Sequence, residues 1–501
     1  MSEGKTSDRA VGAGRGLLYI TGAKIWFMVG ASAIGFVLPH LLSKVAYGVW
    51  GTVLSWVSPV NNVLVTATIQ AVAKFAARGP GFVEGTKRSA LRVQLAVAAV
   101  VAIAWLAIAP LISALEHDAS LTAPLRLATG VSIAYAFYAV FVGAANGARE
   151  FHKQAGLDAT FTTLRTVLVF TGAIAFGTVF AAVGGFVAAA VVVLAIAIAL
   201  VKLPRHHEGD TPTPARELFA FMAPVALYLF ILNALMFIDG WVLKRLVAEA
   251  AEQKGLPSPA SLASEAVAVY TAAQSVARIP YQGILSVTFV IFPLVSSATF
   301  AGDADKTRGY IEKSIRWPLL IVLALASAVA ARPEGLLNFF PAGYQTAGNA
   351  LAILAFAYVA FSLLSIAGTI INGAGHTLPT TIIGVVTLAL DLVLTWAGVR
   401  WALATGHDAL AGAALGTSIA MTLGFVLSLV YLQKKFRASL RLSTVLRGAL
   451  ASAAAIGVGR VLPLHGKLGS FVVCAIAGVV FIVALFVLRE LTPRELRALR
   501  R

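Results

Sequence analysis

Long apolar runs alternate with short polar segments along almost the whole chain. A helix needs about 20 mostly apolar residues to cross a hydrocarbon core about 30 Å thick, because each residue adds about 1.5 Å. Reading the runs between polar breaks predicts fourteen membrane-spanning helices and an all-α, polytopic membrane protein. The expected spans are 16–38, 46–74, 93–115, 124–148, 157–181, 184–203, 217–243, 266–298, 310–331, 346–373, 378–403, 409–433, 443–463 and 469–488.

The polar connections divide these spans into two blocks of six and a final pair. The longest connection, rich in proline and charge, is typical of a linker. Each block begins and ends on the same side of the membrane, so an internal repeat would be a parallel one. The predicted parts are an N-terminal segment 1–15, a first six-helix bundle 16–203, a linker 204–216, a second six-helix bundle 217–433, a basic linker 434–442, two additional helices 443–488 and a basic tail 489–501.

A proline near the middle of the second helix of each block supports the duplication. Pro59 and Pro280 lie at matching distances from the predicted starts of their helices. A proline removes one backbone donor and clashes with the preceding turn, so both helices are expected to be kinked. Interrupted helices at corresponding places in two halves indicate a transport site, and the two prolines are the predicted hinges. Two ordinary membrane prolines remain the alternative.

The composition agrees with this pattern. Of 501 residues, 59% are apolar and only 12% are charged, with a mean hydropathy of +0.86. A soluble domain usually carries about 25% charged residues, so these figures exclude a soluble enzyme, a disordered chain and a disulfide-rich secreted scaffold. The single cysteine, Cys474, lies inside an apolar run, which excludes an internal disulfide.

The distribution of basic residues predicts the orientation. The formal net charge is +17, and 27 of the 39 Lys and Arg residues fall on the side of the N-terminus, against 9 on the opposite side. Cytoplasmic loops carry the excess of Lys and Arg, so both termini are expected in the cytoplasm of a bacterial inner membrane. This topology accounts for the positive charge without nucleic acid as a partner.

Several short phrases resemble those of oligosaccharide flippases. They are Gly48-Val49-Trp50-Gly51, the S-x-x-N-N-like stretch around Asn61 and Asn62, Ala277-Arg278-Ile279-Pro280, and Phe292-Pro293-Leu294-Val295-Ser296. With fourteen spans, the chain resembles the Wzx-type polysaccharide transporters of the multidrug/oligosaccharidyl-lipid/polysaccharide exporter (MOP) superfamily. The arginine-rich first-helix phrase of the related lipid II flippases is not found, which disfavours peptidoglycan cargo.

This resemblance implies two six-helix bundles around a central cavity and transport by alternating access from cytoplasm to periplasm. The implied cargo is a polyprenyl-pyrophosphate-linked oligosaccharide used in cell-surface polysaccharide biosynthesis. The implied partners are this cargo, membrane lipids, and the polysaccharide polymerase or glycosyltransferases of the same pathway.

Three cations are expected at membrane depth: Lys24 in the first span, Arg165 in the fifth and Arg278 in the eighth. A charge inside a membrane costs at least about 2.5–3.5 kcal/mol, so it usually faces a cavity or a partner. A pyrophosphate with an anionic sugar chain would use such cations, because arginine binds phosphate oxygens bidentately. Snorkelling of Lys24 and Arg165, and pairing of Arg278 with a carboxylate, remain alternatives.

Two acids and three amides complete the candidate site. Asp239 and Asp391 could couple transport to a proton or cation gradient, or could form structural ion pairs with the basic residues. Asn61, Asn62 and Gln70 could line the cavity and bind sugar hydroxyls. Interhelical hydrogen bonding explains these amides equally well.

Signals for an enzyme are weak. No P-loop or Rossmann fingerprint occurs, so the chain does not use ATP itself. Asp303-Ala304-Asp305 has the D-x-D shape of metal-bound sugar nucleotide sites, but it stands alone in a short loop. His206-His207-Glu208 has no further ligand near it in the linker. We therefore expect a secondary transporter with no catalytic residue, metal or cofactor. A cation-coupled multidrug exporter, a lipid II flippase and a membrane glycosyltransferase are the alternatives.

Overall fold

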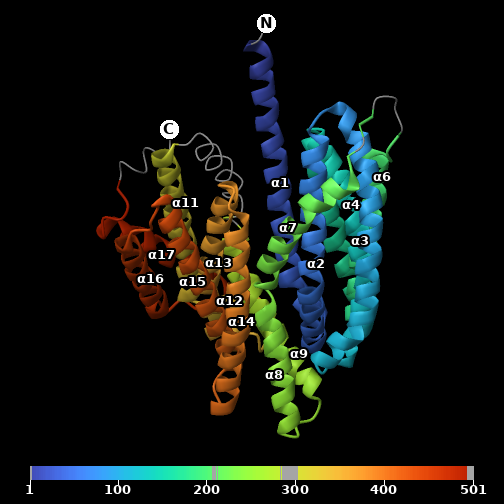
Figure 1. Ribbon diagram of the computed structural model, residues 1–501. Coiled ribbons are helices and arrows are strands. Elements are labelled where there is room, and N and C mark those ends of the chain that lie inside the picture. Colours follow the sequence, from blue (N-terminus) through green and yellow to red (C-terminus); the bar gives the residue numbers. More distant parts are fainter. Residues whose placement is uncertain (1–2, 206–209, 212, 283, 285–302, 493–501) are drawn as a thin grey trace. The chain divides into compact units, whose positions relative to one another are not determined.

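The computed structural model describes residues 3–205, 210–211, 213–282, 284 and 303–492, and these residues form helices and connecting loops without a strand (Figure 1). Thirteen of the helical segments are long and apolar enough to cross a membrane. The predicted all-α, polytopic architecture is thereby confirmed.

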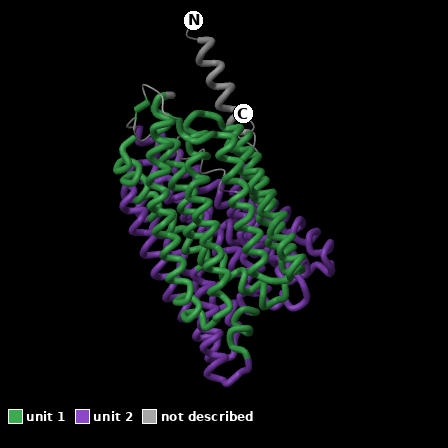
Figure 2. Tube along the Cα trace, turned by 90° about the vertical axis from the view of Figure 1, so that its right-hand side faces the viewer, with its two compact units in different colours: residues 1–237, 258–265 green, residues 238–257, 266–501 purple. Residues whose placement is uncertain are grey.

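The chain divides into two compact units, which are coloured separately in Figure 2. Unit 1 comprises residues 1–237 and 258–265, and unit 2 comprises residues 238–257 and 266–501.

Unit 1 contains seven long helices. They are α1 (Glu3–Leu41), α2 (Lys44–Ala76), α3 (Pro80–Leu115), α4 (Thr122–Gly147), α5 (Phe151–Phe176), α6 (Val179–Val201) and α7 (Ala215–Ala234), with a short 3-10 helix, η1 (Ala119–Leu121), before α4.

Unit 2 contains the remaining helices, except that α9 begins within the part assigned to unit 1. They are α8 (Ile238–Gln253), α9 (Pro259–Ala277), α11 (Ala304–Ala331), α12 (Pro333–Leu337), α13 (Gly348–Gly373), α14 (Thr377–Thr405), α15 (Ala409–Phe436), α16 (Leu442–Val461) and α17 (Gly466–Val487), with η2 (Gln345–Ala347) before α13.

The helix bounds differ from the predicted spans at a few places. The first helix begins at Glu3, so most of the predicted N-terminal segment is helical. The predicted seventh span is divided, because α7 ends at Ala234 and α8 begins at Ile238. Most of the C-terminal part of the predicted eighth span lies outside the described residues. The unit boundary falls after Phe237, because α7 packs against α2 in unit 1; the predicted boundary at 204–216 stays a prediction.

Each unit has one central helix that is largely buried by its neighbours. In unit 1, α4 packs against α2, α3 and α6, and 78% of the most apolar part of its span is buried. In unit 2, α13 packs against α11 and α15, and 83% of the corresponding part is buried. Apolar surface on these two helices is covered by protein, while their neighbours present part of their surface outward.

The helix pairings of unit 1 recur in unit 2 in the same order. The pairs α3–α4, α5–α6 and α4–α6 correspond to α11–α13, α14–α15 and α13–α15, and the pair α1–α5 corresponds to α8–α14. This correspondence supports the parallel duplication that the two prolines indicate in the sequence.

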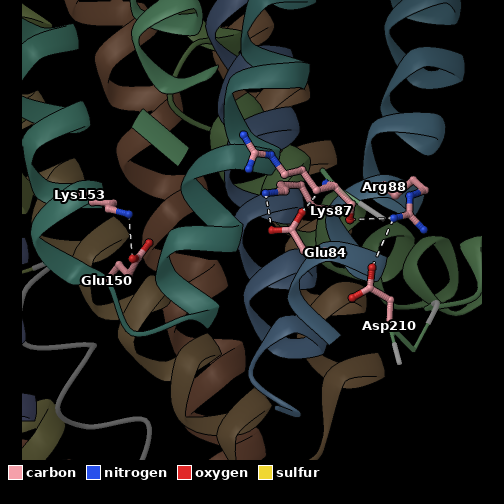
Figure 3. A network of polar contacts seen from close by, with 7 residues as sticks. Glu84, Lys87, Arg88, Glu150, Lys153 and Asp210 are labelled. Carbon is pink, nitrogen blue, oxygen red and sulfur yellow. Dashed lines mark hydrogen bonds and ion pairs between the residues drawn. The ribbon is translucent and has the colours of Figure 1, made fainter. Parts of the chain in front are cut away.

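The linker between α6 and α7 is attached to the beginning of α3 (Figure 3). Asp210 pairs with Arg88 at 3.4 Å, and the backbone N–H of Arg205 donates to Glu84 Oε2 at 2.9 Å. Glu84 also accepts a hydrogen bond of 2.8 Å from Lys87, whose side chain is only 2% exposed. The described residues of the linker are therefore bonded to unit 1.

The packing of α5 against α6 depends on glycines. A Cβ at Gly185 of α6 would overlap the carbonyl oxygen of Leu168, and one at Gly172 of α5 would overlap that of Ala181. Adjacent Gly184 faces more space, since its nearest neighbour, a methyl group of Leu127, would lie 3.9 Å from an added Cβ. Small residues allow this close approach of helix backbones in a membrane.

The additional pair α16–α17 packs against α11 and is joined to it by one buried carboxylate. Glu490, directly after α17, has a side chain 3% exposed and accepts hydrogen bonds from Arg316 (3.0 Å), Arg447 (3.1 Å) and Thr444 (2.7 Å). Burial raises the pKa of Glu490, but these three hydrogen bonds together outweigh burial and hold the pKa below its usual value of 4.5.

We expect Gly185→Ala to lower the free energy of unfolding by about 1–3 kcal/mol, because the methyl group forces α5 and α6 apart. Gly184→Ala is the matched control and should be neutral or stabilising by up to about 1 kcal/mol, since alanine favours a helix. Thermal unfolding of the purified variants in detergent measures both. Equal stability of the two variants would contradict the close packing at Gly185.

We expect Glu490→Gln to lower the free energy of unfolding by about 1.5–3 kcal/mol, because it weakens hydrogen bonds to a buried charge. Glu217→Gln removes an exposed ion pair with Arg78 and should change it by at most about 1 kcal/mol. Because the pKa of Glu490 is lowered on folding, its contribution should be present above about pH 4.5 and be lost as the pH falls below that value. Unfolding scans across that range check both effects.

Candidate functional site

Lys24 of α1 and Asp158 of α5 form an ion pair in unit 1. Lys24 Nζ lies 3.6 Å from Asp158 Oδ2, and the lysine side chain is 53% exposed whereas that of Asp158 is 17% exposed. Tyr138 of α4 donates a hydrogen bond to the other carboxylate oxygen, Oδ1, at 3.2 Å. The pair of α1 and α5 thus carries a half-exposed cation beside a largely covered carboxylate.

Arg165 lies on the same face of α5, two helical turns beyond Asp158. Its guanidinium carbon lies 5.0 Å from the ring centroid of Phe27, 5.6 Å from that of Phe161 and 5.9 Å from that of Phe186. The Nε atom is buried and has no hydrogen-bond partner, and no ion pair joins Arg165 to a carboxylate among the described residues. The rings stabilise the cation by cation–π attraction, but no described anion neutralises it.

The three amides predicted for the cavity have different surroundings in α2. Asn61 is buried and accepts a hydrogen bond of 2.6 Å from Ser132, while its Nδ2 has no partner. Asn62 is exposed and donates to Asn233 of α7 at 2.8 Å. Gln70 is exposed and forms no hydrogen bond with the rest of the described chain. Asn61 and Asn62 therefore join helices of unit 1, and Gln70 is available to a ligand.

Asp239, at the start of α8, lies in a buried hydrogen-bonded group in unit 2. Its carboxylate accepts hydrogen bonds from Tyr270 Oη at 2.7 Å and from Gln274 Nε2 at 2.9 Å, both on α9. The backbone N–H of Gly240 donates a further bond of 2.9 Å. Each oxygen of this carboxylate has a donor, which offsets the cost of burial.

Asp391, in the middle of α14, is completely buried and only partly satisfied. Its Oδ1 accepts hydrogen bonds of 2.9 Å from both Thr395 and Thr417 Oγ1, whereas its Oδ2 has no partner. Its charge interacts unfavourably with that of Asp239, since α8 packs against α14. Two neighbouring carboxylates with an unpaired oxygen and two hydroxyl groups could hold a proton or a monovalent cation.

Arg278 lies where α9 ends, directly after Ala277. Its Nε donates to Tyr358 Oη of α13 at 2.6 Å, and its positive charge interacts favourably with Asp239. The structure thus places Arg278 beside the acidic group of unit 2, as the alternative of structural pairing expects. Pro280 follows this helix end by three residues, whereas α2 continues past the buried Pro59 to Ala76.

The two groups lie on corresponding pairs of helices in the two halves. The pair α1–α5 carries Lys24 and Asp158, and the corresponding pair α8–α14 carries Asp239 and Asp391. Sequence reasoning had singled out three of these four residues. It missed Asp158, which lies next to the edge of the predicted span 157–181. Charged residues are common at the ends of spans, so a charge there does not indicate a functional site. Its spacing of seven residues from Arg165 is the signal that places both on one helix face.

The weak enzymatic candidates have structural roles or lie outside the described residues. Asp303 caps α11, because its side chain accepts a hydrogen bond of 3.0 Å from the backbone N–H of Lys306. His206, His207 and Glu208 lie outside the described residues, as does the phrase Phe292 to Ser296. Within the described part of the chain, no group of three His, Cys, Asp or Glu side chains could hold a metal.

Comparison by sequence finds no matching family model and no matching curated protein. Comparison by structure finds several transporters. The lipid II flippase MurJ in an inward closed conformation is similar with a TM-score of 0.71 and 12% sequence identity, over 94% of this chain and 98% of the flippase.

Two further structures have the same architecture. An inward-facing multidrug resistance MATE family transporter of the MOP superfamily is similar with a TM-score of 0.61 and 16% identity, over 84% of this chain and 94% of that one. A MOP superfamily transporter from Pyrococcus furiosus, for which a reverse polarity of the binding pocket suggests a different function, has a TM-score of 0.53 and 15% identity, over 84% and 95%. These neighbours are a flippase and transporters, and the chain shares their fold.

Proposed function

We propose that the chain is a flippase that moves a polyprenyl-pyrophosphate-linked oligosaccharide from the cytoplasmic to the periplasmic leaflet by alternating access. The observation that carries this proposal is the cationic face of α1 and α5. Among the side chains described there, Lys24 and Arg165 lie with one carboxylate, Asp158, which gives the face a surplus positive charge at membrane depth. A cargo with a pyrophosphate supplies the missing anion.

Energetics favours an anionic cargo over a neutral or cationic one. The cost of desolvating a charge in the membrane is offset when a charge of opposite sign is already fixed in place, and charge-assisted hydrogen bonds are roughly twice as strong as neutral ones. Arg165 is held by three aromatic rings rather than by a carboxylate, so phosphate oxygens do not compete with a resident anion for it. The similarity to a lipid II flippase supports cargo with a lipid tail.

Asp239 and Asp391 are the proposed coupling site. Both are buried, and the free Oδ2 of Asp391 lies near a second carboxylate rather than a resident cation. A proton or cation that enters this group relieves the repulsion between the carboxylates. Binding and release of that ion would then favour different conformations of the helices α8, α9, α14 and α15.

We further propose that the protein lies in a bacterial inner membrane with both termini in the cytoplasm, from the distribution of Lys and Arg. The glycosyltransferases or the polymerase of the same polysaccharide pathway would be its partners. A cation-coupled multidrug exporter is the second candidate, which the buried acids of unit 2 and the similarity to MATE transporters favour. The cationic face of unit 1 argues against cationic drugs.

Neutralising a cation tests the cargo. Lys24→Met and Arg165→Met should each lower flipping of a lipid-linked oligosaccharide at least about tenfold, because each loses a charge-assisted hydrogen bond of about 1.5–3 kcal/mol. Arg278→Met should also lower the rate, because it removes the cation that interacts favourably with Asp239 in unit 2. Arg278→Lys should restore part of the rate, since the charge returns without the bidentate geometry. Appearance of the cargo in the outer leaflet of reconstituted vesicles is the readout.

Lys153→Met is the matched control, because Lys153 pairs with Glu150 at the beginning of α5, and this variant should leave the rate unchanged. Parental flipping rates in all three cation variants, with normal membrane insertion, would eliminate the proposal that these cations bind an anionic cargo. Loss of folded protein in the Arg278 variant alone would assign that residue to structural pairing with Asp239.

Replacing the free carboxylate tests the coupling. Asp391→Asn should abolish the dependence of transport on an ion gradient while the protein stays folded. The amide keeps an oxygen that accepts from the Thr395 and Thr417 hydroxyls, but it carries no negative charge to attract a proton or a cation. Asp305→Asn changes an exposed acid at the start of α11 and should have no effect. Transport into vesicles with and without an imposed proton or sodium gradient distinguishes the two. Unchanged gradient dependence in Asp391→Asn would place the coupling elsewhere.

A further inference from the structure

The ion pair of Lys24 and Asp158 has the geometry of a contact that can open. Its N–O distance of 3.6 Å is longer than the about 2.7–2.9 Å of a strong charge-assisted hydrogen bond. The lysine exposes 53% of its side chain, so its ammonium group can reach another anion without unfolding any part of unit 1. Partly exposed pairs of this kind contribute at most about 1 kcal/mol.

Asp158 keeps a partner when the lysine leaves. Tyr138 donates a hydrogen bond to Oδ1, whereas the lysine lies beside Oδ2. A buried carboxylate that lost its sole partner would cost several kcal/mol. The tyrosine reduces this cost, so the carboxylate can exist both with and without its lysine.

The corresponding helices of the second half show that packing does not require the lysine. There, α8 packs against α14, and these two helices carry two carboxylates, Asp239 and Asp391, and no lysine–aspartate pair is found between them among the described residues. A cation on the first helix is therefore not a general requirement of this helix pairing.

We propose that Asp158 is a built-in counter-ion that occupies Lys24 while no cargo is bound and is displaced from it by the anionic headgroup of the cargo. This inference rests on the proposed function and extends it, because it makes Asp158 a specificity-determining residue. Among the described side chains of this face, Arg165 is the surplus cation while the lysine is engaged. When the lysine is released, two cations face the headgroup. A neutral lipid cannot displace the carboxylate and leaves the pair closed.

Binding of a short analogue of the cargo tests this displacement. The full-length protein is placed in nanodiscs of zwitterionic phosphatidylcholine, and binding of farnesyl pyrophosphate and of neutral farnesol is measured by calorimetry. Asp158→Asn should tighten farnesyl pyrophosphate binding about two- to fivefold, because the competing carboxylate is gone, and should leave farnesol binding unchanged. Glu150→Gln, which removes a carboxylate paired with Lys153 at the beginning of α5, should change neither.

Two further variants separate displacement from a general change in charge. In a Lys24→Met background, Asp158→Asn should have no effect on affinity, because no lysine remains to be released. Tyr138→Phe should weaken farnesyl pyrophosphate binding about twofold or more, since the carboxylate then depends on its lysine. This variant keeps both charges, so it also tests the inference if Asp158→Asn does not fold.

The outcomes distinguish this inference from the proposed function. If the parental protein binds farnesyl pyrophosphate but Asp158→Asn binds it equally or more weakly, Asp158 is not a displaced counter-ion and the inference fails alone. The same conclusion follows if the tightening persists in the Lys24→Met background, or if Tyr138→Phe binds like the parental protein. If the parental protein binds no farnesyl pyrophosphate, the proposed function and the inference fail together.

Discussion

A charge inside hydrocarbon must be matched by another charge, by hydrogen bonds or by aromatic rings, because water is not there to solvate it. Each ionisable group at membrane depth in this protein shows one of these solutions. Asp239 is surrounded by donors, Arg165 by rings, and Lys24 by one carboxylate. The match is incomplete at Asp391 and Arg165, where one buried side-chain atom of each has no hydrogen-bond partner.

The two corresponding helix pairs meet this constraint in different ways. The same pair of helices in each half carries ionisable groups, but one half combines a cation with an anion and the other combines two anions. In the proposed function, one pair of helices binds an anionic headgroup and the other binds a proton or a cation. Electrostatic specialisation of the two halves requires changes at a few side chains and leaves the helix pairing as it is.

The sequence was sufficient for the helices and insufficient for their partners. Long apolar runs predict spans because the bilayer permits few other structures, and the bounds of α14 (Thr377–Thr405) and α15 (Ala409–Phe436) lie within a few residues of the expected spans. Three cations and two acids could be singled out for the same reason. The side chains that contact these charged residues could not be predicted from the sequence. Tyr138, Tyr270 and Phe186 have no distinguishing pattern in an apolar run, and only tertiary packing brings them to their partners. The division of the predicted seventh span into α7 and α8 also depends on packing, since no proline or glycine lies between Ala234 and Ile238.

The burial of α4 has a consequence for synthesis in the cell. The helix enters the membrane before α5 and α6 have left the ribosome, and its span, with a mean hydropathy of 1.7, is apolar enough to insert without them. Until these later helices arrive, Tyr135 and Tyr138 lack part of the cover that buries them in the finished protein. Their rings become covered by Phe161 and Phe186 of the helices that follow. Burial of these two tyrosines is therefore completed only when the later helices of unit 1 have been made.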